Sequence, residues 1–373
     1  MAVLAISGAG GLLGFHLRAF LHARHRNQYD RIVLIGRNDF DNEARLCELL
    51  GDCDSIVHLA ALIAGPADDI LSRNRKISEA LTQALDANKK PRHLVFASST
   101  HIDRDTPYGQ SKRNADAHFS AFCNARGYLY TPIVFPNIFG EGGLAFYNSV
   151  VSTFCSQLVR GRKPELRQDA MLSLMHAQRA AQCIADILLN KKAGTQTPKG
   201  EAITVSGLLS KLEALDRDRR DFMIPDLSSP LDLDLYNTLR SYIDASDLPQ
   251  RLKVRSDDRG SLFESLRSKH GGQVFISTTR PDITRGNHFH LHKLERFCVI
   301  SGEANIRIRK LFSNMTNAYH VSGEYPCVLD IPTLHTHSII NLSNVDLITM
   351  FWAHEIFDPG NPDTYPEPVD HHF

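Results

Sequence analysis

A glycine-rich segment close to the N-terminus limits the fold more than any other feature. The apolar run Val3–Ile6 has the composition of a strand that is buried on both faces, and a helical pattern starts soon after it. Between the two, Gly8, Gly11 and Gly14 would permit a tight turn and let the backbone approach a pyrophosphate at the helix N-terminus. Glycine clusters also form plain strand–helix turns. The segment therefore predicts a parallel α/β domain, with nucleotide binding as one of two interpretations.

Length, charge and cysteine usage exclude several classes of protein. The chain has 373 residues, more than one ordinary core accommodates, so two domains are expected. Its 42 basic and 42 acidic side chains balance, which gives no support for nucleic acid or an anionic membrane as a partner. The 7 cysteines are scattered without a Cys-x-x-Cys pair, and no apolar stretch is long enough to span a membrane. These features predict a reduced, cytoplasmic protein without membrane insertion.

The end of the second apolar run bears on the choice of cofactor. The run 32–35 ends at Gly36, and Arg37 follows directly. In NAD-binding folds an acid in this region usually holds the ribose 2′-hydroxyl, whereas an arginine suits a 2′-phosphate. NADP(H) is therefore predicted. Asp39 lies close by in the sequence and keeps NAD open as the alternative.

A tyrosine and a lysine follow another buried run, 94–97, which leads into a pair of serines. Tyr108 and Lys112 are four residues apart, so on a helix both project from the same face. An ammonium group beside a phenol lowers the pKa of the phenol and lets it exchange a proton with a substrate oxygen while hydride moves. A hydroxyl at the preceding strand end, that of Ser99, would hold the same oxygen. The three side chains predict a reductase centre.

With these motifs, residues 1–245 resemble an extended short-chain dehydrogenase/reductase of the class that acts on nucleotide sugars. The resemblance implies an α/β Rossmann-type doubly wound parallel sheet that binds NADP(H). It implies Ser99 and Tyr108 as the acid pair, Lys112 for tuning and for binding the nicotinamide ribose, and the three glycines for the pyrophosphate. The segment Pro136–Gly140 matches the family's Pro-Asn-x-Phe/Tyr-Gly loop beside the nicotinamide and sugar.

The chain changes character in its last third. Residues 208–250 are rich in charge and contain prolines at 225, 230 and 249, which predicts a hinge or linker. Beyond them, short β-branched runs alternate with turn residues, which is typical of an antiparallel barrel or sandwich. The domain limits are therefore predicted as 1–245 and 246–373.

Four ligand-type side chains stand out in this second domain: His288, His290, Glu295 and His337. Residues two apart on a strand share a face, so His288 and His290 should point together into the barrel. Three imidazoles and one carboxylate suit zinc or another divalent first-row metal and can leave a position open for water or substrate. The chain contains 18 histidines, so a grouping by chance is the alternative.

Residues 246–373 resemble a cupin, an all-β jelly roll, whose metal ligand set the four residues match, although Leu334 stands at a usual glycine position. The segment Arg285–His290 also resembles the deoxyhexulose 3,5-epimerase branch of cupins, in which the first histidine is a metal-free base. A histidine cannot be a tight metal ligand and a free base at once. With metal bound, the candidates for a base would be His292, Asp363 and Tyr365, and the metal could be catalytic or structural.

Over nearly its whole length the chain is similar to the bacterial bifunctional epimerase–reductases of UDP-N-acetyl-L-fucosamine synthesis, used for capsules and O-antigens. The order of the two domains and the segments 254–263, 285–302 and 357–365 support this resemblance. It implies that the cupin inverts C3 of a UDP-2-acetamido-2,6-dideoxy-4-hexulose and that the first domain then reduces C4 with NADPH. A homodimer through the cupin domain is expected.

Three alternatives stay open. The cupin could serve only in dimerisation or substrate binding, which would leave a plain 4-ketosugar reductase. A tightly retained cofactor would instead make the first domain a nucleotide-sugar 4-epimerase or dehydratase. In a different class, the chain could be a non-catalytic NADP(H)-binding sensor or scaffold, against which the intact set of Ser99, Tyr108 and Lys112 argues.

Overall fold

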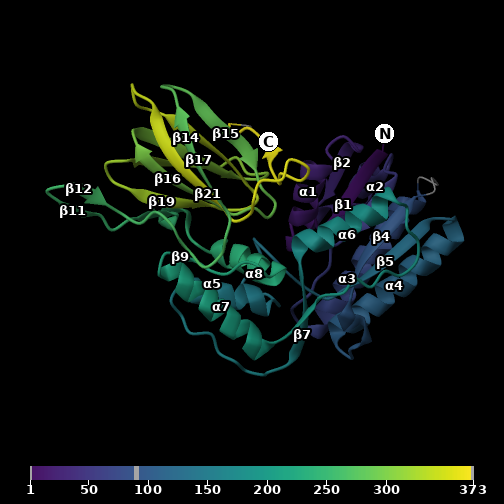
Figure 1. Ribbon diagram of the computed structural model, residues 1–373. Coiled ribbons are helices and arrows are strands. Elements are labelled where there is room, and N and C mark those ends of the chain that lie inside the picture. The colour runs from purple at the N-terminus through teal and green to yellow at the C-terminus, as the bar shows by residue number, and fades with distance from the viewer. Residues whose placement is uncertain (1, 88–91, 371–373) are drawn as a thin grey trace. The chain divides into compact units, whose positions relative to one another are not determined.

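The structure is a computed structural model that describes residues 2–87 and 92–370. The chain divides into two compact units, which Figure 1 colours from purple at the N-terminus to yellow at the C-terminus. The first unit consists of Met1–Thr153 and Leu166–Gly207, and the second of Phe154–Glu165 and Leu208–Phe373. This division does not coincide with the domain limit predicted at residue 245, which stays a prediction.

The first unit is built on a parallel five-stranded sheet in the order β2-β1-β3-β4-β5. Its strands are β1 (Ala2–Ser7), β2 (Tyr29–Ile35), β3 (Ser55–His58), β4 (His93–Ser99) and β5 (Leu129–Phe135). The middle of β1 is fully buried, as expected for a strand of a parallel sheet covered on both faces. A second, three-stranded sheet contains β6 (Asn137–Phe139), β7 (Met171–His176) and β8 (Glu201–Thr204).

Helices cover both faces of the parallel sheet (Figure 1). They are α1 (Leu12–Arg24), α2 (Glu43–Leu50), α3 (Ala67–Asp86), α4 (Pro107–Arg126) and α6 (Ala177–Leu189), with the short 3-10 turns η1 (Asn38–Asp41) and η2 (Thr100–Asp103). Leu50, Leu81 and Phe119 from α2, α3 and α4 pack in one core with Phe96 of β4, while α1 and α6 contact each other. This arrangement confirms the predicted doubly wound α/β fold.

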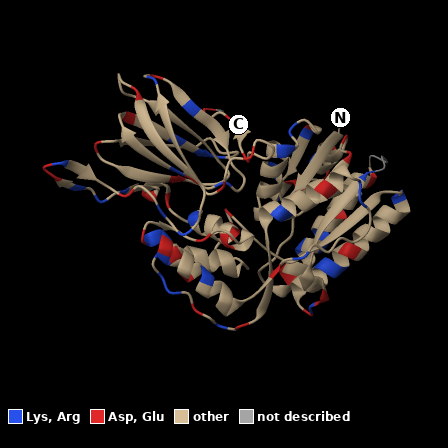
Figure 2. Cartoon of the chain, viewed as in Figure 1, with Lys and Arg blue, Asp and Glu red and all other residues tan. Residues whose placement is uncertain are grey.

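Helix α4, which holds both residues of the Tyr-x-x-x-Lys motif, has strong local start and stop signals. The Thr106 side chain accepts a hydrogen bond from the backbone N–H of Gly109, and Pro107 occupies the first turn. Gly127 ends the helix in the left-handed conformation (φ 65°). In Figure 2 positions of acidic and of basic residues are both marked along α3 and α4, while apolar residues of the two helices belong to the core shared with the sheet.

The second unit is mainly β-structure. Its helices are α5 (Val150–Val159), α7 (Val205–Arg220), α8 (Pro230–Arg240) and the short η3 (Ala245–Asp247), of which α5 and α7 begin a few residues before the limits of the unit. Its strands are β9 (Met223–Ile224), β10 (Pro249–Arg251), β11 (Arg255–Asp257), β12 (Gly260–Leu262), β13 (Arg267–Ser268), β14 (Gln273–Thr279), β15 (Thr284–Phe289), β16 (Glu295–Ser301), β17 (Glu303–Lys310), β18 (Thr316–Ser322), β19 (Cys327–Ile331), β20 (His335–Asn341), β21 (Leu347–Ala353) and β22 (Tyr365–Pro366).

Two antiparallel sheets form the core of this unit, with the orders β10-β19-β16-β21-β14 and β18-β17-β20-β15-β22. Phe297 and Leu329 from the first sheet pack against Ile306 and Ile339 from the second, and all four are buried. The interdigitation of two inner faces is the usual core of a sandwich or jelly roll. The predicted all-β C-terminal domain is thus confirmed.

The prediction of a linker over residues 208–250 is wrong. Leu235, Tyr236 and Leu239 on α8 are fully buried within the second unit. The guanidinium of Arg240 donates to the backbone oxygen of Ile331, 3.1 Å away, which fixes α8 to strand β19. The charges in this stretch misled the prediction because several of them are paired within the fold rather than solvated.

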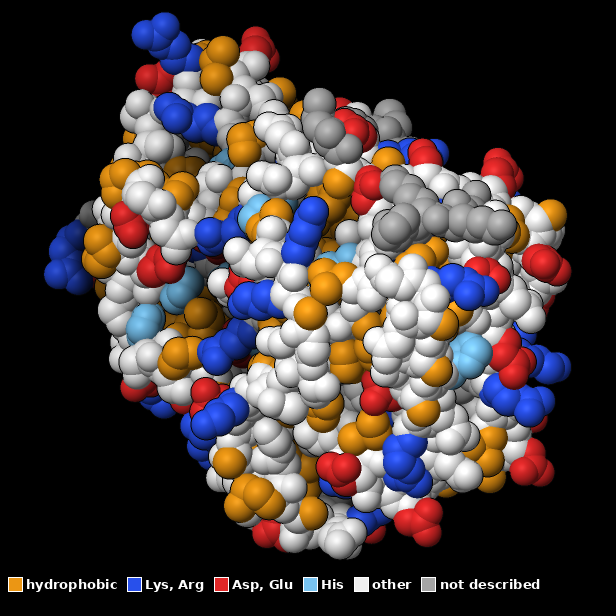
Figure 3. All heavy atoms as spheres, turned by 90° about the vertical axis from the view of Figure 1, so that its right-hand side faces the viewer, with side chains coloured by type: hydrophobic (Ala, Val, Ile, Leu, Met, Phe, Trp, Pro, Cys, Tyr) orange, Lys and Arg blue, Asp and Glu red, His pale blue; other side chains and the backbone are white. Residues whose placement is uncertain are grey.

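The surface agrees with the balanced composition. On the face seen in Figure 3, acidic and basic side chains both occur, with hydrophobic side chains between them. Within residues 2–87 and 92–370, no helix combines the length and the apolar character needed to cross a membrane.

Candidate active sites

The glycine segment forms the turn between β1 and α1, as predicted. Gly8 has a left-handed backbone (φ 69°), and a Cβ there would lie 2.9 Å from the backbone nitrogen of Ala60. A Cβ on Gly14 would lie 2.3 Å from the backbone oxygen of Gly8, so both positions exclude any larger residue. Gly11 is the N-cap of α1 and has no side-chain cap, which leaves the first N–H groups of the helix for a ligand.

A hydroxyl that sequence analysis missed fixes this turn to the next strand. Ser7 Oγ lies 2.7 Å from Nδ1 of the buried His58 and accepts from the backbone N–H groups of Leu59 and Ala60. Burial, followed by the charge of Lys112, lowers the pKa of His58 to about 3, so its ring is neutral. His58 therefore packs in the core and holds the ends of the two strands together.

The region that would meet the adenosine ribose contains Arg37 and Asp39 just after β2. Arg37 is exposed, whereas an Asp39 carboxylate oxygen accepts from the backbone N–H of Gly36 at 2.7 Å. Arg73 on α3 lies beside them, with its guanidinium on the Asp41 carboxylate and 3.4 Å from the backbone oxygen of Arg37. The Asp39 carboxylate is thus already engaged, and Arg37 faces solvent.

The reductase residues lie together at the carboxyl end of β4. Lys112 is buried, donates to the backbone oxygen of Ala97 at 2.7 Å, and its ammonium is 5.6 Å from the centroid of the Tyr108 ring. Burial lowers the pKa of Lys112 to about 8. Burial also raises the pKa of Tyr108 to about 12, which corrects the expectation that the lysine lowers it. At neutral pH the phenol is protonated and can act as an acid.

Ser99 and two residues missed by the sequence analysis, His101 and Asn74, connect β4 and α3 to the segment that holds Tyr108 and Lys112. Ser99 Oγ accepts from the backbone N–H of His101 at 3.2 Å. The rings of His101 and Tyr108 pack edge to face, 6.0 Å between centroids. Asn74 of α3 donates to Ser111 Oγ, one position before Lys112, at 3.0 Å and so ties α3 to α4. Both residues reach the site through tertiary packing, and a sequence pattern gives no signal of that.

A buried polar cluster supports the Pro-Asn-x-Phe-Gly segment. The Glu141 carboxylate lies 2.9 Å from His176 Nε2, and the Glu141 backbone oxygen lies 2.9 Å from His16 Nε2. Burial would raise the pKa of Glu141, but the two histidines outweigh it and hold the pKa far below its usual value. The cluster fixes the chain just after Gly140, which sequence analysis did not foresee.

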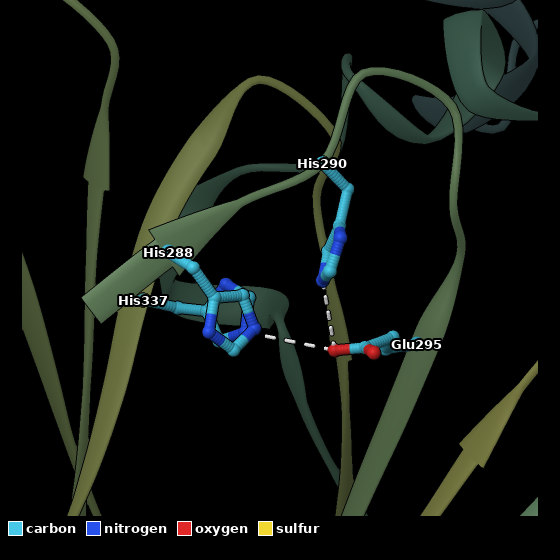
Figure 4. Close-up of side chains that lie close together, drawn as sticks. All are labelled: His288, His290, Glu295 and His337. Carbon is cyan, nitrogen blue, oxygen red and sulfur yellow. Dashed lines mark ion pairs between the residues drawn. The ribbon is translucent and has the colours of Figure 1, made fainter. Parts of the chain in front are cut away.

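The four predicted metal ligands converge in the second unit, as Figure 4 shows. His288 lies on β15, His290 just after it, Glu295 at the start of β16 and His337 on β20. The ligand atoms of all four lie within 4.8 Å of one another. A Glu295 carboxylate oxygen is 3.0 Å from His290 Nε2 and 3.6 Å from His337 Nε2.

A β-bulge in β15 produces this convergence. The register with β20 shifts between Gly286 and His288, which places His288 opposite His337. Gly286 and Asn287 have left-handed backbones (φ 97° and 56°), and a Cβ on Gly286 would lie 2.7 Å from the His337 backbone oxygen. Leu334, at the usual glycine position, is also left-handed (φ 61°), which explains the preference for glycine there.

The chemistry of the cluster fits a divalent metal. Among the described residues, His290 Nε2 and both ring nitrogens of His337 are buried without a hydrogen-bond partner, and the short contact of His290 to Glu295 is not aligned as a hydrogen bond. Buried polar atoms are rarely left unpaired. Burial and the adjacent imidazoles lower the pKa of His288 to about 3, so this ring is neutral and offers a lone pair. Burial lowers the pKa of His337 as well, whereas at His290 the effect of burial is outweighed by the Glu295 carboxylate, which raises the pKa. Three imidazoles and a carboxylate form a common zinc ligand set.

The C-terminal segment holds the turn that follows His290. The Asp363 carboxylate accepts from the backbone N–H groups of Leu291, His292 and Lys293, and the Asp363 backbone oxygen lies 2.6 Å from His290 Nδ1. With Nδ1 engaged, His290 turns Nε2 to the cluster. Three N–H donors occupy the Asp363 carboxylate, which makes it a positioning group rather than a base.

Comparisons with known proteins cover both parts of the chain. The profile of the NAD dependent epimerase/dehydratase family matches residues 4–202, and that of the polysaccharide biosynthesis C-terminal domain matches residues 255–365. A UDP-2-acetamido-2,6-beta-L-arabino-hexul-4-ose reductase of Pseudomonas aeruginosa is 28% identical over 365 residues, which cover 96% of this chain and 97% of the relative.

Solved structures show the same architecture. The capsular polysaccharide assembling protein CapF of Staphylococcus aureus is 31% identical, with a TM-score of 0.62 over 98% of this chain and 99% of CapF. A UDP-N-acetylglucosamine 4-epimerase of Bacillus cereus, 20% identical over 58% of this chain and 83% of its own, has a TM-score of 0.51 and shows the fold alone. These likenesses confirm the predicted resemblance. The chain belongs to the NAD dependent epimerase/dehydratase family, and its C-terminal polysaccharide biosynthesis domain gives it the architecture of CapF.

Proposed function

We propose that the chain is a bifunctional nucleotide-sugar enzyme that supplies precursors of bacterial surface polysaccharides. Its cupin inverts C3 of a UDP-2-acetamido-2,6-dideoxy-4-hexulose, and its first unit then reduces the C4 ketone with NADPH. The observation that carries the proposal is the pairing, in one chain, of the Tyr108–Lys112 acid centre with the His/Glu cluster. The P. aeruginosa relative, named as a reductase of a UDP-linked 4-hexulose, supports the substrate class.

The reduction depends on a proton donor that is protonated before the reaction. When bound, NADPH would supply the hydride for C4, and negative charge would then develop on the ketone oxygen. Tyr108, whose pKa burial raises to about 12, gives its proton to that oxygen, while the Ser99 hydroxyl orients it. The ammonium of Lys112 stabilises the tyrosinate that forms, until solvent returns the proton.

The inversion at C3 uses the acidity that the neighbouring ketone gives to the C3 proton. A divalent metal held by His288, His290, Glu295 and His337 would polarise the C4 carbonyl and stabilise the charge that develops when the C3 proton leaves. Asp363 keeps His290 in the tautomer that turns Nε2 to the cluster. Backbone N–H groups occupy the Asp363 carboxylate, so of the three predicted base candidates His292 and Tyr365 remain.

NADPH is the proposed reductant. A 2′-phosphate needs a cation and no competing carboxylate, and Arg37 is exposed while Asp39 is turned to the backbone N–H of Gly36. Zinc is the proposed metal because of its preference for imidazole nitrogens in four-coordinate sites. The predicted cytoplasmic location suits both substrates, since NADPH and nucleotide sugars are cytoplasmic metabolites.

A homodimer through the second unit is also proposed. Strand β14 is at the edge of its sheet and pairs with β21 alone. Val274, Phe275 and Ile276 on this strand are exposed in succession, so apolar side chains on both of its faces are uncovered. An uncovered apolar edge strand favours pairing with another chain, and a second copy offers the same edge. Mass measurement in solution tests this point.

The test of the two-step function is incubation with the UDP-4-hexulose in heavy water, followed by NMR and by absorbance of the nicotinamide. Deuterium at C3 without NADPH, and NADPH oxidation once it is added, would establish both activities. Oxidation without deuterium at any ring carbon would mean that the cupin is a passive module. Turnover without net NADPH consumption would favour a 4-epimerase or dehydratase, and binding without turnover would favour a sensor or scaffold.

A further inference from the structure

His101, whose ring packs against that of Tyr108, has no role in the proton transfer proposed for the first unit. We propose that His101, together with Asn137, binds the C3 hydroxyl of the sugar and makes C4 reduction selective for a substrate with that hydroxyl in place. This inference rests on the proposed reductase function and deepens it. His101 would be a specificity-determining residue, distinct from the hydroxyl and ammonium groups that handle the proton.

Packing fixes the His101 backbone relative to Tyr108. Only a short connection, which includes η2, joins β4 to α4. A Cβ on Gly109 would lie 2.4 Å from the backbone oxygens of both His101 and Arg104, so the first turn of α4 lies directly on this connection. The guanidinium of Arg113 donates to the Arg104 oxygen at 3.0 Å from the same helix. The position of His101 is thus set by the helix that presents Tyr108.

The ring of His101 lies beside that of Tyr108, the proposed proton donor. The His101 backbone N–H donates to Ser99 Oγ, and an interaction with the Asn137 side chain partly offsets the burial that lowers the pKa of His101. Asn137 is the second residue of the Pro-Asn-x-Phe-Gly segment and the first of β6, and the Glu141 cluster fixes the chain just after this segment. His101 is only partly buried, so one ring nitrogen can meet Asn137 while the other meets a ligand.

The chemistry of the pair favours the C3 hydroxyl over the other neighbour of C4. With the C4 oxygen at Ser99 and Tyr108, the next groups along the sugar ring are the hydroxyl on C3 and the methyl-bearing C5. A neutral imidazole and an amide each donate and accept hydrogen bonds, which suits a hydroxyl. A methyl group there would leave both polar groups buried without partners, at a cost of about 1–3 kcal/mol each.

The experiment compares the UDP-4-hexulose with its 3-deoxy analogue, which has no C3 hydroxyl and no C3 stereocentre for the cupin to change. Wild-type protein should prefer the parent sugar in kcat/KM by roughly tenfold to a hundredfold, the effect of one or two hydrogen bonds. His101→Phe should remove most of this preference by lowering kcat/KM for the parent sugar alone. His101→Gln, which can still donate and accept, should retain part of the preference.

The matched control is His118→Phe on α4, whose ring bonds to Thr82 on α3. It should leave the preference unchanged, and titration with NADPH checks that all variants bind cofactor. If His101→Phe lowers kcat/KM equally for both sugars, or for neither, the inference is wrong although wild-type reduction stands. If wild-type protein oxidises no NADPH with either sugar, the proposed reduction itself is wrong, and the inference with it.

Discussion

The two sites differ in how their buried polar groups are satisfied. In the first unit, the Lys112 ammonium and the Asn74 amide have hydrogen-bond partners within the protein. In the second, His290 Nε2 and both ring nitrogens of His337 are buried without a hydrogen-bond partner among the described residues, and the Glu295 carboxylate is the charged group beside them. An unpaired buried polar group costs about 1–3 kcal/mol. The fold alone therefore satisfies the Lys112 ammonium and the Asn74 amide, whereas the second site gains stability when a metal takes up its lone pairs.

The largest effect that separates the sites is expected for Tyr108→Phe. Loss of the phenol hydroxyl removes the proton donor of the reduction, and NADPH oxidation should slow by about 10²–10⁴-fold. Deuterium exchange at C3 should continue, because it depends on the second unit. The control is Tyr128→Phe, whose hydroxyl bonds to the Leu85 oxygen in the core and should not affect turnover. Reduction at the wild-type rate in Tyr108→Phe would refute the role of this residue.

Removal of one metal ligand should have the converse effect. His337→Ala is expected to weaken zinc binding by roughly a hundredfold or more, since changes merely around a metal site already cost 10–100-fold. Competition with a chromophoric chelator measures the affinity, and NADPH binding should be unchanged. His335→Ala is the matched control on the same strand, because this ring bonds to the Thr333 backbone oxygen at 2.8 Å. Equal zinc affinity in the two variants would contradict the ligand assignment.

The buried ammonium of Lys112 should lower the free energy of unfolding, and Lys112→Met tests this. Burial lowers the pKa of Lys112 from 10.5 to about 8, so between these values the unfolded chain binds more protons than the folded one. The destabilisation that the buried charge causes is complete below pH 8 and decreases as the pH rises towards 10.5. At pH 7 the variant should be more stable by about 1–2 kcal/mol, after loss of the hydrogen bond to Ala97 is counted.

Urea unfolding at pH 7 and at about pH 10 measures this difference, which should shrink at the higher pH. Lys211→Met, at a half-exposed position paired with Asp232, is the control and should show no such trend. A stability difference that does not vary with pH would show that burial does not lower the pKa of Lys112 as inferred.

The smallest expected effect concerns cofactor choice. Arg37→Ala should weaken NADPH binding by about tenfold, the loss of one charge-assisted contact to the 2′-phosphate, and leave NADH binding unchanged. Fluorescence titration with both cofactors gives the ratio. Arg45→Ala, a nearby exposed arginine paired with Glu48, controls for the general change in charge. A parallel loss for both cofactors would show that Arg37 does not read the phosphate.

Motifs that are contiguous in sequence were predictable, because local geometry alone relates their residues. The three glycines, the Tyr108–Lys112 pair and the His288–His290 pair all lie where the sequence indicated. The two fold classes followed from hydrophobic patterning in the same way.

Residues that support those motifs could not be foreseen, because tertiary packing brings them in from distant segments. Asn74 reaches α4 from α3. Asp363 was predicted as a base candidate, but its role in holding the turn after His290 depends on packing that the sequence does not show. The linker prediction, which was based on composition, was wrong at α8 for a related reason. Its buried Arg240 donates to a backbone oxygen across the unit, so a charged stretch that looked like a linker belongs to the core.

The most direct test of two separable activities is to mix the Tyr108→Phe and His337→Ala proteins with the UDP-4-hexulose and NADPH in heavy water. Each variant retains one site, so the mixture should oxidise NADPH and yield a C4-reduced sugar with deuterium at C3. Each variant alone should give at most a trace of that product. No NADPH oxidation by the mixture, or a reduced product without deuterium at C3, would contradict the account.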